Sequence, residues 1–143
     1  MKGVDREEAL RRLAAARVGR LATADAGGIP HVVPMVFVLD GDTIFWAVDE
    51  KPKRTRAIKR LANIRANPNV EVVVDRYQER WDRIWWVRAA GSARIVEGEG
   101  DAARALELLA AKYRQYRKDP PPGPVVAIEV TRLSWWEGGT PGA

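Results

Sequence analysis

The densest group of residues that could bind a ligand is a basic segment in the first half of the chain, residues 51–60. Six of its ten residues are cations: Lys51, Lys53, Arg54, Arg56, Lys59 and Arg60. The segment joins a predicted strand to a helix that Thr55 can cap, and a helix N-terminus offers free N–H groups and a partial positive charge. Together these features predict an anion site, usually one for phosphate. The alternative is a solvated basic helix start that binds nothing in particular.

An apolar hairpin lies just before this basic segment. It contains Pro34 and Met35 on one strand, and Trp46, Ala47 and Val48 on the next. A planar heterocycle needs flat apolar walls and a few polar backbone groups, and a strand interrupted by proline leaves such groups free. The hairpin is therefore a candidate ring site. A plain core hairpin is the alternative, because alternating apolar residues also build a barrel.

Tryptophans are concentrated in the second half of the chain, which holds five of the six: Trp81, Trp85, Trp86, Trp135 and Trp136. Adjacent side chains on a strand point to opposite faces, so one ring of each Trp pair can enter the core and the other must be exposed or meet a partner. Because aromatic residues and arginine are enriched in interfaces, we expect a homodimer interface here. Scattered surface aromatics are the alternative.

Residue types exclude several kinds of catalytic site. The chain has no cysteine and a single histidine, His31, so we expect no thiolate nucleophile, no Ser–His–Asp triad and no metal site. Phosphate-loop and Gly-x-Gly-x-x-Gly motifs are also missing from the sequence. If the protein is an enzyme, we expect a cofactor to carry the chemistry.

Length and composition are those of one globular domain, residues 1–143, with loose tails at 1–4 and 137–143. Hydrophobic residues make up 46% and charged residues 30% of the chain, and the net charge is +5. A basic surface attracts nucleic acid, an anionic membrane or a phosphorylated small molecule, but cations concentrated at one helix start disfavour nucleic acid. With no signal-peptide pattern and no apolar run of membrane-spanning length, we expect a soluble, cytoplasmic protein.

Hydrophobic periodicity and turn signals predict the order α-β-β-β-α-β-β-α-β. The predicted helices cover 5–16, 55–66 and 101–116, and the predicted strands cover 18–24, 29–39, 43–48, 70–74, 84–96 and 125–136. Few crossover helices and short connections favour a mainly β fold, an antiparallel β-barrel with helices packed outside, over a parallel sheet.

Local signals refine the predicted strands. Pro30 and Pro34 cannot donate to a ladder, so the 29–39 strand needs an unpaired side, a bulge or a ligand-facing edge at those points. The Asp40-Gly41 dipeptide predicts a tight hairpin turn. Gly91 predicts a bend or bulge in the 84–96 strand.

Capping residues refine the predicted helices. Asp5 can cap the first helix, and Glu8 completes a capping-box-like pair with it. Asp101 can cap the third helix in the same way.

Six short motifs occur in a fixed order along the chain: Arg20-Leu-Ala-Thr23, Gly28-Ile-Pro-His31-Val-Val-Pro34, Asp40-Gly41, Lys51-Pro-Lys53-Arg54-Thr55, Leu61-Ala-Asn63-Ile-Arg-Ala-Asn67-Pro68 and Trp85-Trp-Val-Arg-Ala-Ala-Gly91-Ser-Ala-Arg-Ile. This ordered set resembles the pyridoxamine 5′-phosphate oxidase-like split β-barrel superfamily, and within it the probable F420-dependent flavin/deazaflavin oxidoreductases. The resemblance covers roughly Ala9 to Trp136, and it is more specific for the fold than for the cofactor.

The resemblance implies a six-stranded antiparallel split β-barrel of the FMN-binding type, which dimerises with two cofactor sites at the interface. It implies that residues 33–36 and 46–48 border the cofactor ring, that the loop at 51–56 holds the phosphate, and that a second subunit adds contacts. The candidate cofactor-binding residues are therefore Val33, Pro34, Met35, Val36, Trp46, Ala47, Val48, Lys51, Lys53, Arg54, Thr55, Arg56 and Lys59, with Trp85, Trp86 and Arg88 from the second subunit.

The cofactors that this resemblance allows differ in their negative charge, which can be compared with the positive charge of the basic segment. FMN carries one phosphate, whereas coenzyme F420 carries a phosphodiester and a glutamate tail. Six cations in ten residues exceed what one phosphate requires, so they favour F420, with FMN as the alternative. Haem ranks lower because His31 is the one potential nitrogen ligand.

The reaction that the resemblance implies is hydride transfer between the deazaflavin and a small, electron-poor organic substrate. The sequence assigns no catalytic residue to this reaction. A non-enzymatic carrier of F420 or flavin is one alternative, and a nucleic-acid-binding module is another.

Overall fold

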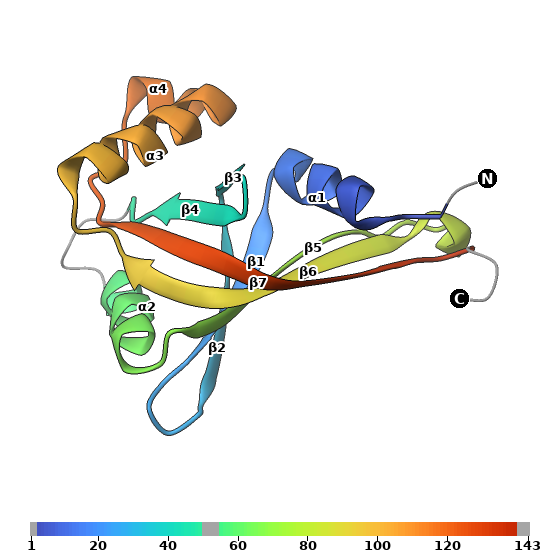
Figure 1. The fold of residues 1–143 in the computed structure, drawn as a ribbon, viewed down its shortest axis with the longest axis horizontal. Helices are drawn as coiled ribbons and strands as arrows, with labels where there is room; N and C mark the ends of the chain where they lie inside the picture. The colour runs from blue at the N-terminus through green and yellow to red at the C-terminus, as the bar shows by residue number, and fades with distance from the viewer. Residues whose placement is uncertain (1–2, 50–54, 140–143) are drawn as a thin grey trace.

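A computed structural model describes residues 3–49 and 55–139, and for residues 55–58 it describes the backbone alone. Figure 1 shows how the elements are arranged. In chain order they are α1 (Arg6–Ala15), β1 (Gly19–Ala24), β2 (Pro30–Met35), β3 (Val38–Asp40), β4 (Thr43–Ala47), α2 (Thr55–Ala66), β5 (Asn69–Arg76), the 3₁₀ turn η1 (Trp81–Arg83), β6 (Trp85–Ile95), α3 (Glu99–Lys112), α4 (Arg114–Lys118) and β7 (Val125–Glu137).

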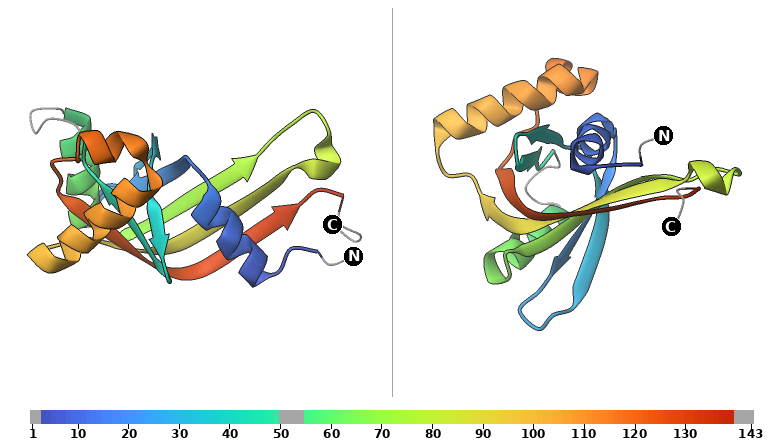
Figure 2. Two further views of the ribbon diagram at one scale, coloured as in Figure 1. Left: turned by 90° about the horizontal axis from the view of Figure 1, so that it is seen from above. Right: turned by 45° about the vertical axis from the view of Figure 1, so that its right-hand side comes forward.

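The strands of the described residues form one antiparallel sheet in the order β2-β1-β5-β6-β7-β4-β3. The long β6–β7 pair runs from Trp85 opposite Glu137 to Ile95 opposite Val126 and forms the spine of the sheet. The sheet curls so that its two ends approach each other, and the helices pack outside it (Figures 1 and 2). This architecture confirms the predicted mainly β split-barrel fold with flanking helices.

The sheet has seven strands within the described residues, where the sequence predicted six. The prediction of a single strand over 29–39 was wrong, because this segment forms two strands, β2 ending at Met35 and β3 beginning at Val38. β2 pairs with β1 at one edge of the sheet, and β3 pairs with β4 at the other edge. One continuous strand cannot pair at both edges, so the chain crosses over at Val36 and Phe37, and the Phe37 side chain is fully buried in the core.

The predicted turn and proline signals are confirmed. Pro30 and Pro34 lie on β2, which is an edge strand and so has an unpaired side. Gly41 turns the β3–β4 hairpin with a φ of 63°, a conformation that favours glycine. The β6–β7 register shifts between Ala90 and Gly91, which is the predicted bulge.

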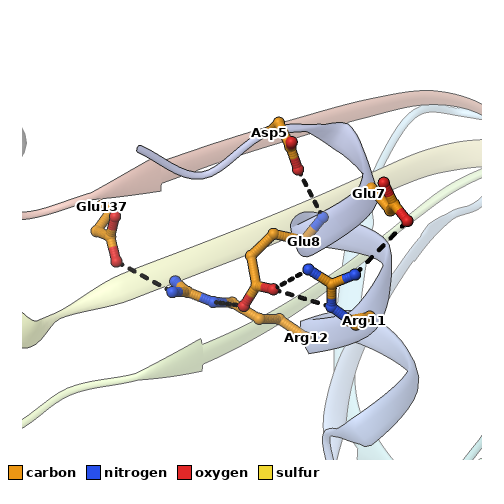
Figure 3. Close-up of polar contacts among 6 residues, drawn as sticks. All are labelled: Asp5, Glu7, Glu8, Arg11, Arg12 and Glu137. Carbon is orange, nitrogen blue, oxygen red and sulfur yellow. Dashed lines mark hydrogen bonds and ion pairs between the residues drawn. The ribbon is translucent and has the colours of Figure 1, made fainter. Parts of the chain in front are cut away.

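Helix α1 begins as predicted, with one difference in its cap (Figure 3). The Asp5 carboxylate accepts a hydrogen bond from the Glu8 N–H at 2.9 Å. The Glu8 carboxylate does not complete a capping box; it instead accepts from Arg11 at 2.6 Å and from Arg12 at 3.0 Å, and these bonds lower the Glu8 pKa. Arg12 also donates to Glu137 at 3.0 Å, which ties α1 to the end of β7.

The predicted third helix, 101–116, is two helices. α3 begins at Glu99 after Gly98, so Asp101 lies inside the first turn and is not the cap. The helix breaks at Tyr113, whose hydroxyl accepts from the Phe37 N–H at 3.2 Å and lies 3.0 Å from the Arg17 carbonyl oxygen. These bonds to distant segments fix Tyr113 where helical continuation alone would not.

The core has two parts. The main cluster lies between the curled sheet and helices α1 and α2, around Leu13, Phe37 and Ile128. A smaller cluster, which includes Leu109 and Tyr116, packs α3 and α4 against β3, β4 and the start of β7. No helix in the described ranges is both long and apolar enough to cross a membrane. Of the predicted loose tails, Glu137 instead belongs to β7, and residues 1–2 and 140–143 lie outside the described residues.

Candidate functional site

A pocket of about 370 Å³ lies between β2, with the turn that follows it, and the end of β4. We call it the ring pocket. Its volume falls in the range of about 300–1,000 Å³ that is typical of small-molecule sites. Its walls are Val18, Leu21, Val33, Pro34, Met35, Val36, Trp46, Ala47, Asp49, Arg60 and Tyr116.

The pocket collects most of the residues that the sequence associated with a cofactor ring. Six of the seven line it, namely Val33, Pro34, Met35, Val36, Trp46 and Ala47. Val48 lies next to them but does not line the pocket. Its side chain is 3% exposed and packs in the main core, and its N–H donates to the Pro124 carbonyl at 3.0 Å.

Trp46 gives the ring pocket a flat wall and an unused donor. The residue is 3% exposed, and its Nε1 atom is buried with no hydrogen-bond partner among the described residues. Burying an unpaired N–H is costly, so such a group marks a place where a ligand acceptor would be stabilising. The Arg60 guanidinium lies 5.6 Å from the centre of the Trp46 ring, which places a cation on the same wall.

Asp49 and Tyr116 form a hydrogen-bonded pair at the pocket. The Tyr116 hydroxyl donates to Asp49 Oδ2 at 2.8 Å. Burial raises the pKa of Tyr116, and the hydrogen bond and negative charge of Asp49 raise it further, so the hydroxyl stays protonated at neutral pH. Asp49 lies two positions before the basic segment in the sequence, and the hydrogen bond holds its carboxylate at the pocket wall.

The pair was not found from the sequence, because its partners are 67 positions apart. Tyr116 enters the pocket through the α3–α4 packing, which no local pattern encodes. Arg60 belongs to the basic segment, but its contact with Trp46 was likewise not foreseen.

The structure describes only two side chains of the basic segment, those of Lys59 and Arg60. Lys51, Lys53 and Arg54 fall outside the described residues, and the side chains of Thr55 and Arg56 are not described. Helix α2 begins at Thr55, as predicted. Lys59 lies 3.9 Å from the Asp25 carboxylate, and Arg60 lines the ring pocket.

The remaining candidates lie on β6, away from the ring pocket of the same chain. Trp85 packs against the core and beneath the Arg12 guanidinium, 4.9 Å from its ring centre. Arg88 lies 5.2 Å from the centre of the Trp86 ring and 3.6 Å from the Glu71 carboxylate. Their assignment to a second subunit's site stays a prediction.

The ring pocket fits a planar heterocycle with an attached anion. Its walls are apolar and include a flat indole, one buried N–H is unpaired, and a guanidinium stands at the wall. The pocket offers one pair of ionisable groups with a hydrogen bond to each other, Tyr116 and Asp49. Over the parts of the chain that the structure describes, there is no cluster of His, Cys, Asp or Glu that could hold a metal ion.

Comparison with known proteins identifies relatives of this architecture. Residues 6–137 match the family model described as pyridoxamine 5′-phosphate oxidase. A comparison with curated proteins found no significant match.

Several solved structures share the fold. A FAD-binding protein from Mesorhizobium loti superposes with a TM-score of 0.70 at 22% identity, over 92% of this chain and 94% of that one. A haem-binding protein from Mycobacterium smegmatis superposes with a TM-score of 0.74 at 22% identity, over 98% of this chain and 57% of that one. The haem storage protein HutZ from Vibrio cholerae superposes with a TM-score of 0.71 at 14% identity, over 92% and 93% of the two chains. At these identities the likeness establishes the fold alone.

Proposed function

This chain belongs to the pyridoxamine 5′-phosphate oxidase family, and from that premise we propose that it is a cytoplasmic, homodimeric F420-dependent oxidoreductase. Its substrate is a small organic molecule. The cofactor ring binds in the ring pocket, and the cofactor's anionic part binds to the basic segment. An FMN-dependent enzyme of the same fold is the alternative.

One observation carries this proposal: the unpaired, buried Nε1 of Trp46 in the wall of an apolar pocket. A carbonyl or ring nitrogen of a flavin-type heterocycle is an acceptor for this donor, and the indole face offers the ring a stacking surface. The segment that follows the pocket wall carries six cations in ten residues. A ring with a multiply charged tail satisfies both features at once.

The descriptions of fold relatives support a flavin-type cofactor, and they also make haem a candidate cofactor. The M. loti relative is described as FAD-binding, and two others are described as haem-binding or haem storage proteins. For this chain we favour the flavin type because its single histidine, His31, does not line the ring pocket. Among flavin-type cofactors, F420 uses the positive charge of the basic segment most fully.

The bound deazaflavin supplies a hydride donor or acceptor. The chain's own residues position and enclose it. Val33, Met35 and Trp46 form the apolar walls, and Arg60 with the basic segment holds the negative charge. The α3–α4 unit covers the pocket through Tyr116, which excludes water from that side.

In the proposed dimer, the second subunit completes the site. Trp85, Trp86 and Arg88 lie on β6, which offers aromatic faces and a guanidinium outside the chain's own ring pocket. Such residues are typical of interfaces and stacking sites.

The proposal is tested by replacing two cations of the basic segment. In Lys53→Ala/Arg54→Ala, we expect F420 affinity measured by calorimetry to fall by at least about tenfold, because two charge-assisted contacts are lost. The control, Arg114→Ala/Lys118→Ala, removes the same charge from α4 and should bind normally. Unchanged F420 binding in the first variant would exclude the basic segment as the anion site.

A non-enzymatic carrier of the same cofactor is a second candidate. The one ionisable pair of the described pocket wall, Tyr116 with Asp49, is engaged in its own hydrogen bond, so the pocket holds no evident proton donor for a substrate. Oxidation of reduced F420 is the test, followed by absorbance against a panel of nitro, quinone and enone acceptors. Tight binding with no turnover across the panel would favour the carrier.

A further inference from the structure

A second hollow, distinct from the ring pocket, lies between the end of α1, the start of β1 and the β5–β6 pair. Its volume is about 550 Å³, and its charged or aromatic walls are Arg12, Arg17, Arg20, Asp75, Arg76 and Trp85. We call it the arginine groove. Four guanidinium groups and one carboxylate line it, so its wall carries an excess of three positive charges.

Much of this charge has no counterion in the fold. Arg17 donates to the Lys112 carbonyl oxygen at 2.9 Å and stacks 4.7 Å from the centre of the Tyr113 ring, neither of which is an anion. Arg76 has no ion pair with any residue that the structure describes. Arg20 faces Asp75 at a loose 3.6 Å with both side chains substantially exposed.

Arg12 lines the groove and carries an unused hydrogen-bond donor. Its Nε donates to Glu8 and its Nη2 to Glu137, each at 3.0 Å (Figure 3). These two bonds hold the guanidinium 4.9 Å from the centre of the Trp85 ring. Its Nη1 atom is buried and has no hydrogen-bond partner among the described residues. A fixed guanidinium with an unpaired Nη1 group is a preorganised anion ligand.

The surrounding field is positive enough to perturb a neighbouring group. The ammonium of Lys112 lies over the Phe37 and Tyr113 rings, close to Arg17. Burial first, and the charge of Arg17 second, lower the pKa of Lys112 to about 8. The smaller of these two causes, the charge of Arg17, is the one that acts on the groove, where it favours binding of negative charge.

Another hollow, on the outer face of the sheet, provides a contrast. It has a volume of about 510 Å³ and includes Glu71 and Arg132. There the two charged lining residues, Glu71 and Arg132, lie 3.8 Å apart, so each has an opposite charge beside it. In the arginine groove Arg12 and Arg20 have carboxylate partners, but Arg17 and Arg76 have none among the described residues.

The groove adjoins the ring pocket. Val18 lines both, and it is 44% exposed although it is apolar. A molecule of modest length can therefore occupy the two hollows together across Val18. Arg60, the last residue of the basic segment, lines the ring pocket but not the arginine groove.

We propose that the arginine groove binds the acidic end of the substrate, a group with at least two negative charges such as a dicarboxylate or a phosphate, while the rest of the substrate reaches the cofactor ring across Val18. This inference rests on the proposed function for the identity of the ring pocket. It assigns the substrate to the polyanionic organic acids or phosphate esters. Arg17, Arg76 and the free Nη1 of Arg12 are its ligands.

The test uses the purified full chain and simple anions as probes. Citrate and pyrophosphate are titrated by calorimetry, with acetate as the monoanion, all at equal ionic strength. We expect citrate, pyrophosphate or both to bind at one site per chain, and acetate to bind at least about tenfold more weakly. Citrate reports carboxylate recognition and pyrophosphate reports phosphate recognition, so the arms separate the two sources of charge. Equal weak binding of all three anions would overturn the proposal.

Matched double variants locate the binding. Arg17→Gln/Arg76→Gln should weaken anion binding by about tenfold or more, because two charge-assisted contacts disappear. Arg65→Gln/Arg114→Gln removes the same charge from exposed positions on α2 and α4 and should leave binding unchanged. Circular dichroism confirms that both variants fold. An equal loss in both would show a general charge effect and overturn the groove as the site.

The same variants distinguish this proposal from that of the cofactor pocket. F420 affinity should be unchanged in Arg17→Gln/Arg76→Gln, and citrate or pyrophosphate should still bind when F420 saturates the protein. If F420 displaces the anion, and the variant also loses F420, the groove holds the cofactor's own tail and the substrate assignment is wrong. If the anion binds but neither F420 nor FMN does, the proposed function fails, and the assignment to a substrate fails with it.

Discussion

Replacing Trp46 by Phe should weaken cofactor binding and cost little stability. The same replacement at Trp135 should lower stability and leave cofactor binding unchanged. The Trp46 substitution removes the buried, unpaired Nε1–H from the ring pocket and keeps an aromatic wall. Removing a buried donor without a partner relieves about 1–3 kcal/mol, while the smaller ring loses about 1–2 kcal/mol of apolar burial. The two effects oppose each other, so the free energy of unfolding of the cofactor-free protein should fall by no more than about 1 kcal/mol.

Cofactor binding should weaken in the same variant. The lost indole donor is worth about 0.5–1.5 kcal/mol if it meets a ring acceptor, which corresponds to a roughly 2- to 12-fold rise in the Kd for F420. Urea unfolding measures the stability, and calorimetry measures the affinity.

Trp135→Phe is the matched control. The Trp135 Nε1 donates to the Val4 carbonyl oxygen at 3.0 Å, so this indole is already satisfied by the fold. Its replacement should lower the free energy of unfolding by about 1–3 kcal/mol and leave F420 affinity unchanged. The reasoning is refuted if Trp46→Phe destabilises the protein as much as Trp135→Phe and binds F420 as tightly as the native chain.

Four further substitutions test other parts of the structure. Tyr116→Phe loses the 2.8 Å hydrogen bond to Asp49, so urea unfolding should show a loss of about 1–2 kcal/mol, and a variant as stable as the native chain would contradict the pairing. In Gly91→Ala, the new methyl group would overlap the Glu129 carbonyl oxygen, so we expect a loss of at least about 2 kcal/mol. Gly100→Ala, where the added methyl group meets nothing within 4 Å, should instead gain about 0.5–1 kcal/mol. For Lys112, whose pKa is about 8 in the fold against an ordinary lysine value of 10.5, the unfolded chain binds more protons between these two values, so native stability should rise as the pH increases from 8 to about 9.5. Lys112→Met should remove that part of the rise, and an unchanged pH profile in this variant would show that Lys112 is not its source.

The sequence predicts most elements of this fold because their signals are local. Pro30 and Pro34 mark an edge strand, Gly41 marks a hairpin, and Gly91 marks a bulge, since each reflects a property of one residue's backbone. The break at Val36 and Phe37 was missed because an unbroken apolar run carries no sign of where its pairing partner changes. That change depends on how the sheet closes, which is a property of the whole fold.

The candidate site divides in the same way. The pocket walls, including Met35 and Trp46, were found because consecutive strand residues converge where the hairpin was expected. Tyr116 was not found, because its contact with Asp49 depends on the break between α3 and α4 at Tyr113. The Tyr113 side chain is held at that break by a hydrogen bond to Phe37, which is distant in sequence. The arginine groove was missed for a similar reason: it joins α1, β1 and β5, and no one segment of the sequence contains it.

The most direct test of the account is a parallel calorimetric titration of the purified protein with F420 and with FMN. We predict that F420 binds tightly, with one molecule per chain, that FMN binds more weakly, and that Trp46→Phe weakens F420 binding. Preference for FMN would contradict the F420 assignment and favour the alternative, an FMN-dependent enzyme of the same fold. Binding of neither cofactor would contradict the claim that the pocket between β2 and β4 is a site for a flavin-type ring.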